Sequence, residues 1–215
     1  MSQNIHQNRP LATAGANLET AAAAMILVHG RGATAQGMIQ MAQPFMQGGV
    51  AYLAPQAGQH SWYPESFLEP VEQNEPERSS GLDRIAALVD QIHSAGLSTE
   101  QIIFCGFSQG ACLASEYIAR HPKRYGGAAI LSGGLIGGSI DPAEYTGDLE
   151  HTPVFIGCSD TDPHIPESRV HETADVLQRL NADVDVRLYS GMGHRINQDE
   201  ISAVKSLQMA ATDAE

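Results

Sequence analysis

The sequence has few cysteines, few basic residues and no long hydrophobic run. Its three cysteines are an odd number, lie in or beside apolar segments and show no C-x-x-C spacing, so we expect reduced thiols and no disulfide framework. Twelve Lys and Arg stand against 25 Asp and Glu, which gives a formal net charge of -13. This charge argues against nucleic-acid binding and against docking on anionic membranes, so the substrate should be neutral or gripped locally.

Signals for export or membrane insertion are also missing. The first twenty residues are polar and lack a basic start that leads into an apolar stretch. The longest apolar run, residues 21–28, is far too short to span a bilayer, so stable membrane insertion is not expected. Together with the reduced cysteines, these features favour a cytoplasmic protein.

Length and composition predict one globular domain. The chain has 215 residues, of which 42% are hydrophobic and 17% charged. We assign residues 1–20 to a polar, flexible N-terminal segment and residues 21–215 to the domain. A homodimer remains open, because nothing in the sequence decides the oligomeric state.

Apolar runs alternate with amphipathic patterns along the chain, which is typical of an α/β fold. Predicted strands are Met25 to His29, Val50 to Ala54, Ile102 to Cys105, Ala128 to Leu131, Val154 to Ile156 and Val184 to Tyr189. Predicted helices are Thr34 to Gln47, Leu82 to Ala95, Ala111 to Arg120, Glu167 to Leu180 and Asp199 to Met209. Each helix is long enough to cross back over a parallel sheet.

Two connections are too long to be simple turns, residues 55–80 and the glycine-rich residues 132–152. Long loops in a compact domain usually carry function or disorder. The first of them contains Trp62, Tyr63 and Phe67 in a polar setting. These aromatic side chains either line a substrate pocket or anchor the loop to the core.

The pentapeptide Gly-Phe-Ser-Gln-Gly at residues 106–110 lies between a predicted strand and a predicted helix. A serine on such a sharp strand-to-helix turn needs small neighbours two positions away on each side, which Gly106 and Gly110 supply. The helix behind Ser108 directs free N–H groups and the positive end of its dipole toward the serine. This pattern predicts a nucleophile elbow.

A serine hydroxyl is a poor nucleophile near neutral pH and needs a histidine base oriented by a carboxylate. In elbows of this kind the acid and then the histidine follow the serine along the chain, each after a later strand. Of nine histidines, only His194 and, less well, His164 meet that condition, and the glycines around His194 favour it; Asp160 or Asp162 supplies the acid. An alternative zinc site of Asp162, His164 and His171 has suitable residue types, but its spacing matches no standard pattern, so we expect no metal.

The oxyanion of a tetrahedral intermediate also needs two hydrogen-bond donors. The backbone N–H of Gln109, directly after the nucleophile, is one expected donor. The second is expected from the loop after an early strand, where His-Gly-Arg-Gly at residues 29–32 places the N–H of Arg31. Met192, in the glycine-rich turn before His194, joins the three aromatic residues as a predicted substrate-binding residue.

Four of these motifs resemble those of the phospholipase/carboxylesterase family of α/β-hydrolases, which also contains acyl-protein thioesterases. They are His-Gly-Arg-Gly at 29–32, Gly-Phe-Ser-Gln-Gly at 106–110, Asp-Pro-His-Ile-Pro at 162–166 and Gly-His at 193–194. The resemblance implies a single-domain α/β-hydrolase fold, a mostly parallel sheet with helices on both faces, and no cofactor. It also favours Asp162 over Asp160 as the acid. Arg31 is bulkier than the leucine of many esterase members.

We therefore expect a serine hydrolase that cleaves a small-molecule carboxylic ester of small or medium acyl length. A thioesterase or lactone hydrolase would use the same groups on another leaving group, although lactone hydrolases of the dienelactone type generally have cysteine at the elbow. From another class, a noncatalytic protein of the same fold would bind a ligand, but such proteins usually lose a triad residue.

Overall fold

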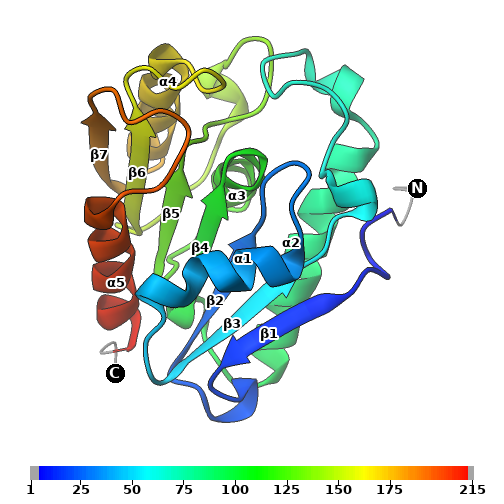
Figure 1. Ribbon diagram of the computed structural model, residues 1–215, viewed down its shortest axis with the longest axis vertical. Helices are drawn as coiled ribbons and strands as arrows, with labels where there is room; N and C mark the ends of the chain where they lie inside the picture. Colours follow the sequence, from blue (N-terminus) through cyan, green and yellow to red (C-terminus); the bar gives the residue numbers. More distant parts are fainter. Residues whose placement is uncertain (1–4, 213–215) are drawn as a thin grey trace.

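The computed structural model describes residues 5–212 and has a seven-stranded sheet at its centre (Figure 1). The strand order is β1-β3-β2-β4-β5-β6-β7, and every pairing is parallel except that of β1 with β3. The strands are β1 (Leu11–Gly15), β2 (Ala23–Val28), β3 (Val50–Pro55), β4 (Ile102–Phe107), β5 (Gly127–Leu131), β6 (Pro153–Ser159) and β7 (Asp183–Tyr189). The helices are α1 (Ala35–Ala42), α2 (Glu77–Ser94), α3 (Gln109–Arg120), α4 (Glu167–Arg179) and α5 (Gln198–Thr212).

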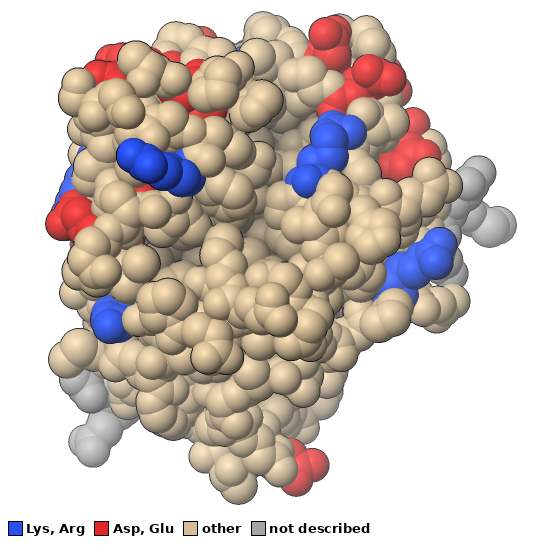
Figure 2. Space-filling view, viewed as in Figure 1, with Lys and Arg blue, Asp and Glu red and all other residues tan. Residues whose placement is uncertain are grey.

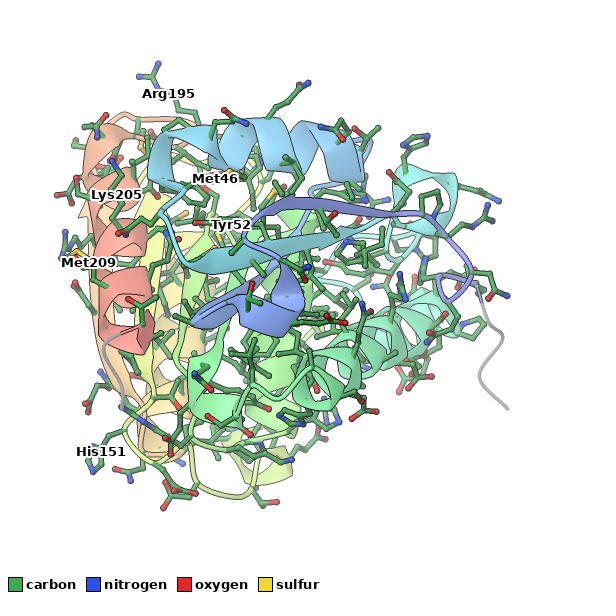
Figure 3. All side chains as sticks on the ribbon, turned by 90° about the horizontal axis from the view of Figure 1, so that it is seen from below. Met46, Tyr52, His151, Arg195, Lys205 and Met209 are labelled. Atoms are coloured by element: carbon green, nitrogen blue, oxygen red, sulfur yellow. The ribbon has the colours of Figure 1, made fainter. Side chains whose placement is uncertain are left out.

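Helices cover both faces of the sheet, because the inner strands are buried on both sides. Every residue of β2, β3 and β5 is buried, which is why these strands read as nearly continuous apolar runs. One core cluster joins the sheet to α2, α3 and α4, and the other joins it to α1 and α5. Figure 3 shows α1 and α2 on opposite sides of the sheet.

Polar contacts join α5 to β3 and to the segment between α1 and β3. Tyr52, labelled in Figure 3, donates a hydrogen bond to Gln208 of α5 and accepts one from the backbone N–H of Gln47 at 2.7 Å. The Gln47 side chain donates in turn to the carbonyl of Lys205 at 2.7 Å. These bonds satisfy buried polar groups at the α5 interface.

The predicted α/β class is confirmed, and six strands and five helices lie where the sequence predicts them. The first helix is shorter than predicted: it ends at Ala42 and continues as a 3-10 turn, Gln43–Phe45, because Pro44 cannot donate a helical hydrogen bond. Helix α2 begins at Glu77, earlier than predicted. Its first turns are polar and give no apolar periodicity to detect.

Strand β1 was not predicted. It pairs antiparallel with β3 from Leu11 opposite Pro55 to Gly15 opposite Ala51 and forms one edge of the sheet. Its small residues, Leu-Ala-Thr-Ala-Gly, give too weak an alternation to indicate a strand. The expected domain boundary at residue 20 therefore does not coincide with the edge of the sheet, while residues 1–4 lie outside the described residues.

All six strands that run parallel to one another end at the same side of the sheet, shown at the top of Figure 1. Loops that follow β2, β4, β6 and β7 meet there, as is usual for ligand sites of open α/β sheets. Within residues 5–212, no helix has both the length and the apolar character required to cross a membrane.

Candidate active site

Ser108 lies on a sharp turn between β4 and α3. Its backbone has φ 56° and ψ -124°, an unusual conformation for a residue other than glycine, and its N–H donates to the Leu131 carbonyl at 3.0 Å. The turn tolerates no side chain at the flanking glycines. A Cβ at Gly106 would lie 2.4 Å from the Gly110 carbonyl oxygen, and one at Gly110 would lie 2.0 Å from that of Val28.

His194 and Asp162 form a hydrogen-bonded pair across two loops. The Nδ1 atom of His194, on the loop after β7, lies 2.8 Å from Oδ2 of Asp162, on the loop after β6. Because an ionised carboxylate only accepts, the Nδ1–H donates and Nε2 is left free to accept a proton. The Asp162 side chain is fully buried and that of His194 is 20% exposed. The imidazole is therefore held in one orientation and still reaches the pocket.

Asp162 is kept ionised by its surroundings. Burial alone would raise its pKa, but hydrogen bonds from His194 and from the backbone N–H groups of His164 and Ile165 outweigh burial and lower the pKa. Those N–H groups donate to Oδ1 at 2.9 and 3.1 Å, so both carboxylate oxygens have partners. The arrangement supplies a buried negative charge directly beside the imidazole.

Asp160, the other candidate acid, faces a different partner. Its Oδ1 accepts from the Gly191 backbone N–H at 2.8 Å, and this bond lowers the pKa of the exposed Asp160 carboxyl. It thereby joins the loop after β6 to the loop that carries His194. The structure thus brings Asp162 to His194, whereas Asp160 contacts backbone.

A pocket of about 530 Å³ opens beside Ser108 and His194. Figure 2 shows a hollow on the same side of the molecule. The lining consists of Gly30, Arg31, Ala33, Tyr63, Ser66, Phe67, Phe107, Ser108, Gln109, Cys112, His164, Ile165 and His194. The Phe107 ring packs against the His194 ring with centroids 4.9 Å apart. Among the described residues no hydrogen bond joins the Ser108 hydroxyl to His194, although both side chains line this pocket.

Two of the four predicted substrate-binding residues line the pocket, and two do not. Tyr63 and Phe67 are part of the lining. Trp62 is fully buried instead, and its Nε1–H donates to the His29 carbonyl at 2.8 Å, so it is the loop anchor that the sequence left as an alternative. Met192 is not part of the lining, and its sulfur accepts a hydrogen bond from the Asn197 side chain at 3.0 Å.

Several lining residues were missed by the sequence analysis. Phe107 and Cys112 flank the serine, one at the end of β4 and one a turn into α3, so their positions in the motif were a usable signal. Ser66, His164 and Ile165 come from loops, and no periodicity indicates where a loop side chain points. The long loop of residues 55–80 contributes three of the lining residues, which fits its predicted functional role.

The two predicted oxyanion donors lie on either side of the serine. A Cβ at Gly30 would be 3.3 Å from the Ser108 Cβ, so the loop after β2 touches the elbow directly. Arg31 and Gln109 both line the pocket. Within the described part of the chain, neither backbone N–H has a hydrogen-bond partner, which leaves both available for an oxyanion.

The side chain of Gln109 forms hydrogen bonds to the loop that contains Trp62 and Tyr63. We call residues 57–67 the strap. The Gln109 Oε1 accepts from the Trp62 backbone N–H at 2.9 Å, and its Nε2 donates to the Tyr63 carbonyl at 2.8 Å. One buried amide thus satisfies both a donor and an acceptor of the strap backbone.

The side chain of Arg31 also forms hydrogen bonds to the strap. Its Nη1 and Nη2 donate to the carbonyl oxygens of Pro64 and Glu65 at 2.6 and 2.5 Å, and its guanidinium carbon lies 5.9 Å from the Tyr63 ring centroid. Both residues whose N–H groups are predicted to form the oxyanion hole therefore hold the strap through their side chains. The side chains of Arg31 and Gln109 are thus both bonded to the same short segment of backbone.

The alternative zinc site finds no support in this geometry. His171 lies on α4 and contacts Glu167 at 3.4 Å, whereas Asp162 is bonded to His194. Residues 5–212 contain no group of three or more His, Cys, Asp or Glu side chains that could hold a metal ion.

Comparison with known proteins gives consistent matches to esterases. A family model described as Phospholipase/Carboxylesterase matches residues 14–210. A crystal structure of a phospholipase/carboxylesterase from Dyadobacter fermentans superimposes with a TM-score of 0.91 at 40% identity and covers 97% of this chain and 100% of that one. This neighbour shares the fold over the whole domain.

Two curated relatives are more distant in sequence. A probable carboxylesterase, SOBER1-like, from Arabidopsis thaliana is 27% identical over 150 residues, which is 68% of this chain and 57% of the relative's length. Acyl-protein thioesterase 1 from Debaryomyces hansenii is 26% identical over 225 residues, covering 94% of this chain and 95% of that protein. The match thus spans little more than half of the plant protein but nearly all of the yeast one.

Proposed function

The chain belongs to the Phospholipase/Carboxylesterase family, and on that premise we propose that it is a serine esterase acting on carboxylic esters of small or medium acyl length. The observation that carries the proposal is the pair of Asp162 and His194, joined at 2.8 Å beside a serine in a nucleophile-elbow conformation. The similarity to a probable carboxylesterase and to an acyl-protein thioesterase supports hydrolysis of esters and thioesters. No metal or organic cofactor takes part in the proposed reaction.

The first half of the reaction forms an acyl-enzyme. The Ser108 oxygen attacks the acyl carbonyl carbon while His194 Nε2 accepts the hydroxyl proton, and Asp162 stabilises the resulting imidazolium. The backbone N–H groups of Arg31 and Gln109 bind the negative oxygen of the tetrahedral intermediate. When the intermediate collapses, the C–O bond to the alcohol breaks, and the imidazolium gives its proton to the departing oxygen.

The second half repeats these steps with water. His194 Nε2 removes a proton from water, which attacks the acyl carbonyl, and the second tetrahedral intermediate uses the same two backbone donors. Collapse breaks the bond to Ser108, which regains its proton from His194, and releases the carboxylic acid. Asp162 remains ionised throughout, in agreement with its lowered pKa.

Thioester hydrolysis is the second candidate function. The acyl-protein thioesterase from Debaryomyces hansenii aligns over nearly its full length, which supports this option. The same groups would expel a thiolate in place of an alkoxide. A lactone hydrolase is less well supported, because the elbow carries Ser108 and not cysteine. A noncatalytic binding protein would not need the complete set of groups in the pocket.

Labelling and turnover of two serine variants test the proposal. A fluorophosphonate probe should label the wild type but not Ser108→Ala, which should also lose about 10³-fold or more of its activity on p-nitrophenyl esters. Ser202→Ala is the matched control, since Ser202 is exposed on α5 and only bonds its own helix. A folded Ser108→Ala protein with near wild-type turnover would exclude the serine mechanism. Parallel acyl thioesters would separate the two candidate functions.

Finer parts of the proposal concern location and partners. The three free, buried cysteines support a reducing, cytoplasmic setting, and the net charge of -13 supports the absence of nucleic-acid partners. A homodimer stays a prediction that light scattering on the purified protein would decide. The single domain of residues 21–215 also stays a proposal; because Leu11–Gly15 pairs with β3, removing residues 1–20 would test whether the domain begins before residue 21.

A further inference from the structure

Arg31 brings a positive charge to the lining of the candidate pocket, while the nearby carboxylate of Asp162 is buried and bonded to His194. Arg31 is exposed and lines the pocket beside Ser108, whereas no Asp or Glu belongs to the lining. Within residues 5–212, no carboxylate lies within 4.0 Å of the Arg31 guanidinium, although Arg78, Arg169 and Arg187 all have such partners. In a chain with 25 acidic and 12 basic residues, this local balance is the reverse of the overall one.

The surface view agrees with this local charge. Figure 2 shows Lys or Arg side chains on both sides of the hollow, and acidic side chains along the upper part of the same face. A substrate that approaches the hollow therefore passes positive charge on either side. Such an arrangement favours the entry and binding of an anion over a neutral molecule of the same shape.

The guanidinium of Arg31 is held in place before any ligand binds. The carbonyl oxygens of Pro64 and Glu65 fix its two terminal nitrogens, and Tyr63 packs beside it. A guanidinium has five N–H donors, so two bonds to the strap leave others free to meet a carboxylate. Because the side chain is already ordered, binding an anion costs little additional conformational entropy.

The rest of the lining is suited to a short hydrocarbon chain. Tyr63, Phe67, Phe107 and Ile165 present apolar surface between the serine and the walls of the pocket. The pocket therefore combines a nucleophile, an apolar section and one fixed cation. These are complementary to an ester group, a methylene chain and a terminal carboxylate.

We propose that Arg31 selects substrates with a free carboxylate in addition to the ester, so that this protein is an esterase of anionic monoesters. The inference rests on the proposed serine-esterase function and names the substrate class of the same site. Arg31 then has two roles: its backbone N–H contacts the oxyanion, and its guanidinium pairs with the substrate carboxylate.

Two substrate series test this selection. In the first, monomethyl esters of the C4 to C8 dicarboxylic acids are compared with the same esters in which a carboxamide replaces the free carboxylate. In the second, O-butanoyl hydroxy acids, with the carboxylate on the alcohol side, are compared with their amides. Within each pair the two molecules differ in charge but hardly in size. Hydrolysis is followed by chromatography of the released acids.

In at least one series, kcat/KM of the wild type should be about tenfold higher for the carboxylate, the usual scale of one charge-assisted hydrogen bond. Arg31→Gln should abolish this preference, mainly by lowering kcat/KM for the carboxylate. Arg179→Gln, which removes an exposed charge at the end of α4, should keep the preference. Added salt should weaken the preference in the wild type, a readout that needs no variant to fold.

Other outcomes would overturn the inference. If carboxamides are hydrolysed as fast as carboxylates in both series, no anion is selected. If Arg31→Gln slows both members of a pair equally and keeps their ratio, the side chain only positions the strap. If the wild type neither reacts with a fluorophosphonate nor hydrolyses any ester, the proposed function itself fails, and this inference falls with it.

Discussion

Replacing Asp162 by Asn should nearly abolish turnover while leaving the fold intact. The present carboxylate accepts the Nδ1–H of His194 at 2.8 Å and thereby leaves Nε2 unprotonated. An asparagine that turns its N–H₂ group toward the ring would favour the other tautomer, in which Nε2 carries the proton. That imidazole cannot accept the proton of Ser108, and the imidazolium formed later would have no negative partner.

The size of the effect follows from the burial of this pair. The Asp162 side chain is fully buried, so no solvent replaces the lost interaction. Loss of both the tautomer and the charge in a serine triad costs about 10⁴-fold in turnover, or about 5 kcal/mol in the activation barrier. Because hydrogen bonding keeps the pKa of Asp162 below its usual value, the wild-type carboxylate remains ionised at every pH where the assay is run.

Asp160→Asn is the matched control for this experiment. Its carboxyl is exposed and bonds the Gly191 backbone N–H, a contact that the carbonyl oxygen of asparagine can preserve. We expect turnover within about threefold of wild type, since exposed substitutions rarely have larger effects. Both variants are compared by p-nitrophenyl ester kinetics and by circular dichroism. A folded Asp162→Asn protein with more than a tenth of wild-type turnover, or a crippled Asp160→Asn protein, would refute the assignment.

Three further predictions concern the surroundings of this pair. Gly110→Ala should lower the free energy of unfolding measured in urea by at least about 2 kcal/mol, because the added Cβ would lie 2.0 Å from the Val28 carbonyl oxygen. An unchanged midpoint of urea unfolding would contradict the elbow geometry. Gln109→Met removes the side-chain hydrogen bonds to Ser61, Trp62 and Tyr63 of the strap but keeps the backbone N–H, so kcat should fall about tenfold with little change in KM. An effect on KM alone would argue against a role in positioning the donor. Burial raises the pKa of Glu200 to about 7, so the folded state holds its proton more tightly than the unfolded state. The contribution of Glu200 to stability should therefore fall by roughly 3 kcal/mol or less as the pH rises from about 4.5 to 7 and then level off, while the lowered pKa values of buried His6 and His29 act in the opposite direction. Glu200→Gln can still accept from the Asn197 N–H, so the stability difference between wild type and this variant should show the Glu200 slope in pH-dependent urea titrations.

The sequence was sufficient for most of the sheet because burial on both faces leaves a distinct pattern. Strands such as β2 and β5 are wholly apolar, and the helices between them repeat at the helical period. The edge strand Leu11–Gly15 has no such pattern, because its small residues are only partly buried. Its pairing depends on a partner distant in sequence, β3, which local periodicity cannot indicate.

A similar division holds for the site. Ser108, His194 and the two candidate acids could be selected because loops after parallel strands converge at one side of the sheet. The choice among Trp62, Tyr63 and Phe67 could not be made, since three nearby aromatic residues on a loop have no period that separates buried from pocket-facing positions. The hydrogen bonds from the Gln109 side chain to the strap also escaped prediction, because the bonds to Trp62 and Tyr63 are made with backbone atoms, which every residue type has.

The hydrogen bonds that Gln109 and Arg31 make to the strap have a consequence for protein engineering. Gln109 and Arg31 hold the strap mainly through main-chain atoms of residues 62–65, and their side-chain contacts in the strap are with Ser61 and Tyr63. Substitutions at Ser66 and Phe67, which face the pocket, would therefore leave these anchors in place. A combinatorial library at those two positions should change the acyl preference in many clones while sparing expression and probe labelling. These two positions of the strap could then be varied by directed evolution while the rest of the protein is left unchanged.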